Sequence, residues 1–229
     1  MSYAQFIKAQ REQHGFTYDE MAKLAEMSRS SYFALERGDK KLTLEEAVRI
    51  ASIFSISVEY LLAGMVPDFA KYRQMIIAFL RKAKESGVEL KKTKLAKLLY
   101  FADFAWYFQT SQSMSGLAYR KIDYGPVPDA YFRVLEEMDE QARIEIRKKD
   151  VDGKTMYEIS ETFISEIEDL NLISSREFDL IDDIWNKWKN KNTNQIVQYT
   201  HNQIPYKTVD MNQIIPYELI KKENPEYVY

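Results

Sequence analysis

One segment of this 229-residue chain, residues 93–108, constrains the fold more than any other. Its sequence, TKLAKLLYFADFAWYF, puts large apolar or aromatic side chains on every side of a helix. A folded protein buries such a helix at its centre, because no face of it is suited to water. We therefore expect a largely helical domain packed around a core that includes Leu98, Leu99, Tyr100, Asp103, Trp106 and Tyr107.

Asp103 is the only charged residue between Leu98 and Phe108. A carboxylate inside a core needs a hydrogen-bonding or charged partner to offset its lost hydration. We expect Arg120 or Lys121 to supply it. No second acid or histidine lies near Asp103 in the sequence, so we expect this carboxylate to be structural and not catalytic.

The region before this domain, residues 16–62, has the pattern of several short helices. Thr17 with Glu20 forms the capping-box spacing that begins one helix, and Ser28 caps the next, which ends at Gly38. Two short helices joined by a tight turn form a helix-turn-helix.

A further helix follows in the same region, beginning at Thr43. Its apolar residues are expected to face the core of the module. The expected inward set comprises Leu44, Val48, Ala51, Ile53 and Phe54.

The helix that begins after Ser28 has two distinct faces. Tyr32 and Leu35 are expected to point inward, which leaves the other side of the helix free to approach DNA. The predicted DNA-contacting residues of the module are Thr17, Ser28, Arg29, Ser30, Phe33, Ala34 and Arg37.

This pattern resembles the Xre/Cro-type repressor family, and the run ALERG is similar to the end of that family's recognition helix. The resemblance implies base contacts by Arg29, Ser30 and Ala34. Phe33 and Ala34 are apolar, so Arg29 is the main residue predicted to form hydrogen bonds with bases. Phe33 or Ala34 can contact only a thymine methyl group. Residues 1–66 carry eight basic and nine acidic residues, without the basic surplus of strong DNA binders. Two alternatives follow: a weak DNA reader, or a packing or dimerisation unit.

Glycine and proline in the run GMVPD, residues 64–68, predict a boundary between domains at 1–66 and 67–229. Twelve of the 16 tyrosines and all three tryptophans follow residue 66. In the second domain, residues 117–122, 143–148 and 155–159 are strand-like, and Asp152-Gly153 is a hairpin signal. We therefore expect a mainly α protein, in which a helix-turn-helix domain precedes a larger α+β domain with a small three-stranded antiparallel sheet.

The runs KLAKLLYFADFAWYF, YGPVPDAYFRVL and YTHNQIPY resemble the Panacea domain, also called the SocA-like domain, across about residues 68–229. The resemblance implies an antitoxin without enzymatic activity, which binds and neutralises a toxin protein encoded nearby. It also implies that the toxin inhibits translation and that the helix-turn-helix represses the shared promoter. The predicted toxin-binding residues are Tyr119, Tyr124, Gly125, Pro126 and Val127.

Other chemistry finds little support in the sequence. The chain has no cysteine and no phosphate-binding glycine loop, and His14 and His201 fall in different domains, so we expect no cofactor and no metal. The absence of a long apolar run or signal peptide predicts a cytoplasmic protein. Expected partners are the toxin and operator DNA, in a homodimer or a toxin–antitoxin hetero-oligomer. The alternatives are a stand-alone transcriptional regulator and an adaptor that delivers a client to a protease.

Overall fold

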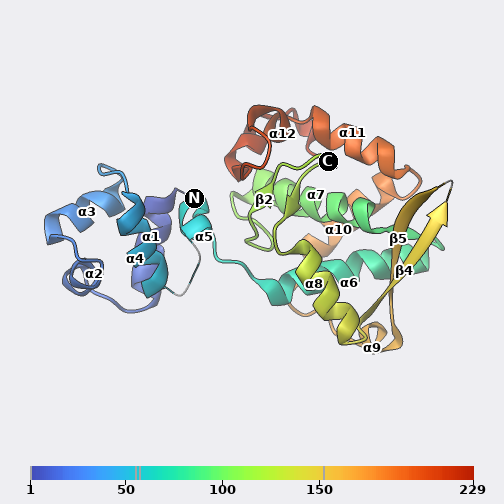
Figure 1. Ribbon diagram of the computed structural model, residues 1–229, viewed down its shortest axis with the longest axis horizontal. Coiled ribbons are helices and arrows are strands. Elements are labelled where there is room, and N and C mark those ends of the chain that lie inside the picture. Colours follow the sequence, from blue (N-terminus) through green and yellow to red (C-terminus); the bar gives the residue numbers. More distant parts are fainter. Residues whose placement is uncertain (1, 55, 57, 152) are drawn as a thin grey trace. The chain divides into compact units, whose positions relative to one another are not determined.

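The computed structural model describes residues 2–54, 56, 58–151 and 153–229 (Figure 1). The chain is mainly helical with small antiparallel sheets, which confirms the predicted fold class. It divides into two compact units: residues 1–67 with 116–118, and residues 68–115 with 119–229. The turn residue Asp152, and part of the predicted end of the first module, lie outside the described residues.

The smaller unit is built from short, well-capped helices. The Thr17 hydroxyl accepts a hydrogen bond from the Glu20 backbone N–H, and the Glu20 carboxylate accepts one from the Thr17 backbone N–H, so the predicted capping box is confirmed. Ser28 caps the following helix, which ends at Gly38 in the left-handed conformation (φ 82°). The helices are α1 (Tyr3–Gln13), α2 (Tyr18–Leu24), α3 (Arg29–Arg37), α4 (Leu44–Ile53) and α5 (Val58–Ala63).

The expected inward face of α4 is partly wrong. Leu44 and Val48 are exposed, whereas Ala47 and Ile50 are buried. Residues 47, 50, 51 and 54 also follow the i, i+3, i+4, i+7 spacing of a helix face. Leu44 and Val48, which are four residues apart, fit a helical period equally well, so local spacing alone does not select the buried face.

The larger unit comprises helices and short strands. Its α-helices are α6 (Phe69–Glu85), α7 (Lys92–Thr110), α8 (Tyr131–Glu140), α9 (Phe163–Glu166), α10 (Ser175–Trp188), α11 (Thr193–Asn202) and α12 (Ile204–Thr208). Its strands and 3-10 helices are β1 (Leu90–Lys91), β2 (Tyr119–Arg120), β3 (Val127–Pro128), β4 (Ile144–Val151), β5 (Lys154–Glu161), η1 (Tyr217–Lys222) and η2 (Pro225–Tyr227).

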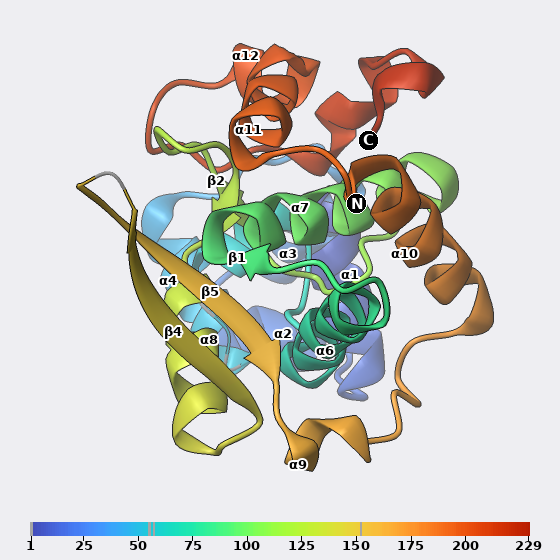
Figure 2. The same cartoon turned by 90° about the vertical axis from the view of Figure 1, so that its right-hand side faces the viewer.

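Helix α7 is the centre of the larger unit, as its sequence predicts. It contacts α6, α10, α11, η1 and β5, and Figure 2 shows it surrounded by these elements. Of the predicted core residues, Trp106 is only partly buried, which corrects its assignment; its ring lies 5.6 Å from the Arg176 guanidinium, which covers it from outside. The predicted core residues that are buried are Leu98, Leu99, Tyr100, Asp103 and Tyr107.

The three-stranded antiparallel sheet has the order β1-β5-β4. Its third strand is β1, directly before α7, and not the predicted segment 117–122. That segment instead forms β2, which pairs with β3 in a separate two-stranded ribbon, Tyr119 opposite Pro128. Pro128 lacks a backbone N–H donor, so a short two-stranded ribbon accommodates it better than a larger sheet.

None of the helices within the described residues has the length and apolar character needed to cross a bilayer.

Candidate functional site

The predicted recognition helix α3 has the orientation that its sequence indicates. Tyr32 and Leu35 are fully buried, whereas Arg29, Ser30 and Phe33 are exposed on the outer side. Ala34 is partly exposed beside them. The outer face therefore has the geometry of a DNA-reading face, and contact with DNA remains a prediction for its residues.

A shallow hollow lies on this face, lined by Tyr18, Arg29, Ser30 and Phe33. The Tyr18 and Phe33 rings meet edge to face, with their centroids 5.5 Å apart. An apolar aromatic wall beside a guanidinium group and a hydroxyl group suits a base edge that carries both a methyl group and hydrogen-bonding atoms.

Both predicted arginine contacts on this face are already paired with carboxylates. Arg29 Nε lies 3.2 Å from Asp19 Oδ1, and Arg37 Nε lies 2.9 Å from Asp39 Oδ2. All four side chains are exposed, so water screens these ion pairs and each is weak. The two carboxylates nevertheless lower the positive charge that the face offers to phosphate groups.

Thr17 and Ser28 are exposed, but their hydroxyl groups are already occupied. Thr17 Oγ1 donates to Glu20 Oε2 at 2.8 Å, and Ser28 Oγ accepts from the Ser31 backbone N–H at 3.1 Å. These contacts begin α2 and α3. The structure thus gives both predicted DNA-contacting residues a role in placing the helices.

A buried ion pair that the sequence analysis missed supports the recognition helix from behind. Arg11 Nε donates to Glu36 Oε1 at 2.7 Å, and Arg11 Nη2 donates to Glu36 Oε2 at 3.1 Å. The hydrogen bond that Arg11 donates to Glu36 raises the pKa of Arg11. The guanidinium also lies 4.1 Å from the Tyr18 ring centroid. Glu36 follows Tyr32 by four residues, which places it on the inner side of α3. This spacing is the sequence feature that predicts its burial.

In the larger unit, Asp103 is fully buried and held by groups other than those predicted. It accepts hydrogen bonds from Ser115 N–H (2.7 Å), Ser115 Oγ (2.5 Å) and Tyr119 Oη (2.8 Å). Burial raises the pKa of Asp103 to about 6, and these hydrogen bonds oppose that rise.

The expected partners of Asp103 bind elsewhere. Arg120 forms a two-bond ion pair with Asp129, and Lys121 Nζ donates to the Val209 carbonyl at 2.8 Å. A backbone amide and two hydroxyl groups satisfy the buried carboxylate without bringing a second charge into the core. Asp103 is therefore a structural centre that joins α7 to the segment after it.

Most of the predicted toxin-binding surface is inside the larger unit. Tyr119 is fully buried, and Gly125, Pro126 and Val127 are buried as well. Their burial follows from the β2–β3 ribbon, which packs against α7. The assignment of these four residues to a contact surface is therefore wrong for this structure. Tyr124, with an exposed fraction of 71%, is the one predicted toxin-binding residue that a partner can reach.

A buried lysine holds this turn in place. Lys97 Nζ donates to the Pro126 carbonyl at 2.7 Å, and burial strongly lowers the pKa of Lys97. A side chain at Gly125 would meet Thr200 Oγ1 at 2.8 Å and the Lys97 side chain at 2.9 Å. The YGPV run is thus explained by close packing against α7 and α11.

The two histidines have local contacts in separate units. His14 Nδ1 lies 2.8 Å from the Gln10 carbonyl oxygen, so this side chain at the end of α1 can pair with a carbonyl group of the last turn. The His201 ring stacks on Tyr206 with centroids 4.4 Å apart, and burial, then Lys97 and Lys121, lower its pKa. Within the described residues, no three histidine or carboxylate side chains lie together as metal ligands do.

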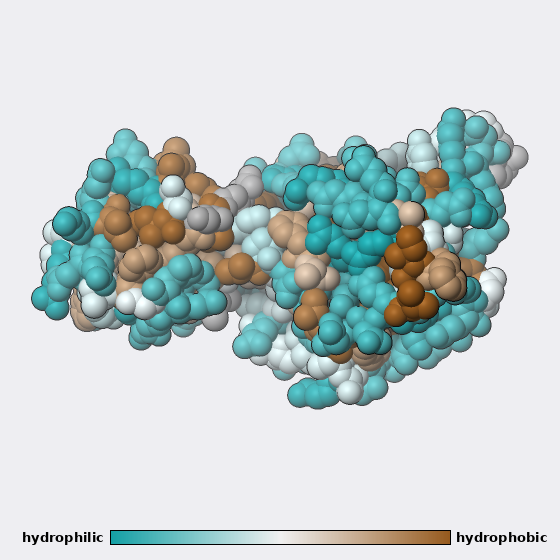
Figure 3. All heavy atoms as spheres, turned by 90° about the horizontal axis from the view of Figure 1, so that it is seen from below, coloured by the Kyte–Doolittle hydropathy of each residue, from teal (hydrophilic) through white to brown (hydrophobic). Residues whose placement is uncertain are grey.

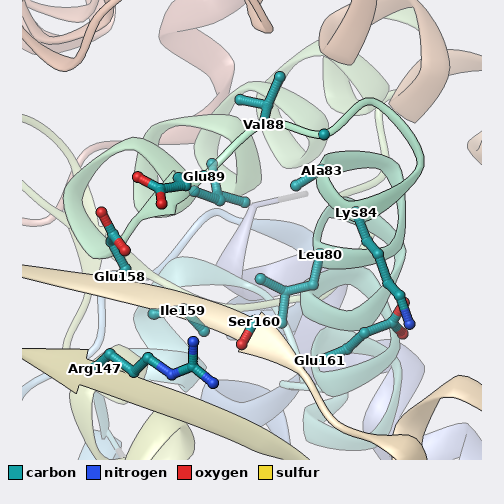
Figure 4. Close-up of a pocket in the computed structure, with 12 residues that line it drawn as sticks. Leu80, Ala83, Lys84, Val88, Glu89, Arg147, Glu158, Ile159, Ser160 and Glu161 are labelled. Carbon is teal, nitrogen blue, oxygen red and sulfur yellow. The ribbon is translucent and has the colours of Figure 1, made fainter.

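In the larger unit, a hollow of about 320 Å³ lies between the end of α6 and the β4–β5 hairpin. Figure 4 shows Glu89 and Glu158 at one end of it and Lys84 and Glu161 at the other. The floor is apolar, with Leu80, Ala83, Leu90 and Ile159. Lys149, outside the hollow, already pairs with both Glu89 and Glu158, at 2.9 and 2.5 Å.

Comparison with known protein families finds one match in each part of the chain. Residues 7–61 match the helix-turn-helix family, and residues 95–206 match the family described as the antitoxin SocA-like, Panacea domain. The second match includes Asp103, the YGPV turn, the β4–β5 hairpin and α9. No curated protein and no solved structure matches the chain. The two matches support a role as an antitoxin or DNA-binding regulator.

Proposed function

Because this chain joins an Xre-like helix-turn-helix to a SocA-like Panacea domain, we propose that it is the antitoxin of a toxin–antitoxin pair. In this proposal the Panacea domain neutralises the toxin by direct protein contact. The observation that carries the proposal is the antitoxin-like match over residues 95–206, which includes most of the central helix of the larger unit.

We propose that neutralisation requires binding and no catalytic step. The buried ionisable groups that distinguish this domain are used to hold its own backbone. Asp103 accepts three hydrogen bonds from the segment after α7, and Lys97 donates to Pro126. Such groups maintain a shape, and a shape suffices for an inhibitor that covers its target.

The proposed target inhibits translation and is encoded by a neighbouring gene, so the pair acts in the cytoplasm. The helix-turn-helix then represses the promoter of both genes. The even charge balance of residues 1–66 and the carboxylates paired with Arg29 and Arg37 support a weak contribution from this module alone.

Co-expression with the neighbouring gene product tests the proposal. We expect that product alone to arrest growth, and this chain to restore growth when both are produced. A neighbouring product that is harmless alone, or that arrests growth despite this chain, would contradict the antitoxin function.

Two further measurements separate the alternatives. An adaptor that delivers its client to a protease predicts that rescue disappears in protease-deleted cells, whereas direct contact predicts that rescue persists. A stand-alone regulator predicts tight operator binding in a gel-shift titration at a stated salt concentration, without any effect on growth arrest.

A further inference from the structure

The larger unit exposes a compact apolar surface that its own fold does not use. Phe163 and Ile164 on α9, and Ile167 directly after it, have exposed fractions of 73%, 52% and 72%. We call these three residues the α9 patch. Helix α9 lies at the lower side of the larger unit in Figure 1, the side that faces the viewer in Figure 3, where brown atoms gather on the surface. A cluster of large exposed apolar side chains is typical of a protein-binding site.

The backbone under the α9 patch is firmly held. Arg81 Nη2 donates to the carbonyls of Ser165 at 2.8 Å and Glu168 at 3.3 Å, and a third bond reaches Glu166. Ser165 is fully buried below the patch. A segment ordered in advance loses little conformational entropy when a partner binds.

A glutamine extends this support to the residues that follow. Gln74 Nε2 donates to the Asp169 carbonyl at 3.1 Å, and Gln74 Oε1 accepts from the Leu172 N–H at 2.8 Å. The α9 patch is therefore fixed to α6 on its inner side at several points. Its three apolar side chains are left pointing outward from a rigid base.

Several acidic residues flank the α9 patch in the sequence. Glu161, Glu166 and Glu168 pair with Arg81, Lys84 and Arg143. Within the described part of the chain, Asp169 and Glu140 form no ion pair. Glu140 lies near the start of the patch through Ala142, two residues later, because the Ala142 carbonyl accepts a hydrogen bond from Thr162 Oγ1. The rim therefore has a surplus of negative charge.

We propose that the α9 patch is the docking surface for the toxin, and that the toxin presents an apolar recess with a basic rim. This inference rests on the proposed antitoxin function and assigns that function to a surface. Three apolar side chains on a hydrogen-bonded backbone at the centre, with unpaired carboxylates at the edge, match the usual anatomy of a protein interface. Because interfaces pair opposite charges, an acidic rim here requires basic residues at the edge of the partner's recess.

The α9 patch is better suited to bind a protein than the toxin-binding surface predicted from the sequence. Of that surface only Tyr124 is accessible, as a single ring on a turn. The α9 patch combines three large side chains, a pinned backbone and an acidic rim. Tyr227 is the matched control outside the patch, because its exposed fraction of 54% is nearly equal to the 52% of Ile164.

The first test measures the affinity of the full-length protein for the purified product of the neighbouring gene by calorimetry. The double variant F163S/I167S is expected to bind at least about tenfold more weakly, as truncation of central interface residues usually does. The Tyr227→Ser control is expected to stay within about twofold of the unchanged protein. Circular dichroism melts check that both variants remain folded. Unchanged affinity of a folded F163S/I167S variant would overturn the inference.

The second test addresses the charge of the partner. The association rate of the unchanged protein should fall as salt is raised, and E140Q/D169N should associate more slowly with a weaker salt dependence. An association rate that does not change with salt concentration, or that is higher for E140Q/D169N, would overturn the inference that the toxin has a basic rim.

The remaining outcomes are distinct. If the unchanged protein binds no toxin, both the antitoxin function and this docking surface are overturned. If the unchanged protein binds while F163S/I167S binds equally well, only the docking surface is overturned. A dimer of this chain that dissociates in F163S/I167S, with toxin affinity unchanged, would assign the patch to a second copy instead.

Discussion

Two carboxylates set the charge of the predicted DNA-reading face. Asp19 pairs with Arg29, and Asp39 pairs with Arg37, on the exposed side of the recognition helix. DNA must compete with these carboxylates for the guanidinium groups, and its phosphates are repelled by any carboxylate that remains. The weak DNA binding that we propose is therefore a property of individual residues and not of the helix-turn-helix fold.

Neutralising these acids should strengthen DNA binding. We expect Asp19→Asn and Asp39→Asn each to raise affinity for a promoter fragment by about three- to tenfold at about 0.1 M salt. Fluorescence anisotropy titration measures the change. The control Glu12→Gln, on α1, should change affinity by less than about twofold. Equal affinity of all three variants would show that these acids do not face the DNA.

Asp103 makes the larger unit sensitive to pH in an unusual direction. Its pKa is about 6 in the folded protein, against 3.8 as the ordinary value. Between these values the folded chain holds the proton and the unfolded chain has released it. The free energy of unfolding therefore falls as pH rises from about 4 to about 6, by about 3 kcal/mol from this group, and levels off above that range.

Urea unfolding of the unchanged protein and Asp103→Asn across pH 4 to 7 isolates this contribution. The stability of the unchanged protein relative to the variant should decrease through the interval and then become constant. A difference that stays constant, or that grows with pH, would show that Asp103 ionises in the fold at least as easily as in water.

At the scale of elements, the YGPV turn is fixed by its fit between α7 and α11. Gly125 has φ +89°, and a methyl group there would meet Thr200 and Lys97. Gly87 has a similar backbone, φ +63°, with open space around it. The two glycines share the left-handed strain and differ in packing, so they separate the two effects.

Alanine at both positions should reveal that difference. Gly87→Ala is expected to lose about 1 kcal/mol of unfolding free energy from backbone strain. Gly125→Ala is expected to lose about 1 to 3 kcal/mol more, because buried groups must move. Chemical denaturation of the full chain measures both. Similar losses would mean that Lys97 and Thr200 move aside easily.

The elements differ in how far the sequence predicts them. The capping pairs that begin α2 and α10 involve neighbours three residues apart, so the pattern alone identifies them. The face of α4 was mispredicted because both Leu44 with Val48 and Ala47 with Ile50 fit a helical period. Local periodicity cannot choose between two apolar faces when the choice depends on which helices pack against α4, as α2 and α5 do here.

The same limit applies to the candidate sites. The outward residues of α3 were predictable because one helix defines them. The partners of Asp103 were not, because Ser115 and Tyr119 lie 12 and 16 residues away and enter through the fold of the loop. Burial of Gly125 and Pro126 likewise follows from packing of the β2–β3 ribbon against α7. The α9 patch is visible only when exposure is known.

At the scale of the whole molecule, the chain separates two tasks. The smaller unit carries a reading face with little net positive charge, and the larger unit carries a rigid apolar surface with an acidic rim. We infer that affinity for a protein partner dominates, and that DNA contact is auxiliary. This division predicts that neutralisation does not need the reading face: Arg29→Ala should abolish promoter binding and leave rescue of growth unchanged.

The central claim is that the toxin is neutralised by direct contact. The most direct measurement is titration of the purified full-length protein into a reconstituted translation reaction that contains the purified toxin and no protease. Translation is predicted to recover fully at about one molecule of this protein for each molecule of toxin. The F163S/I167S variant is predicted to require a large molar excess. Translation that stays blocked at saturating concentrations of the unchanged protein would contradict neutralisation by contact.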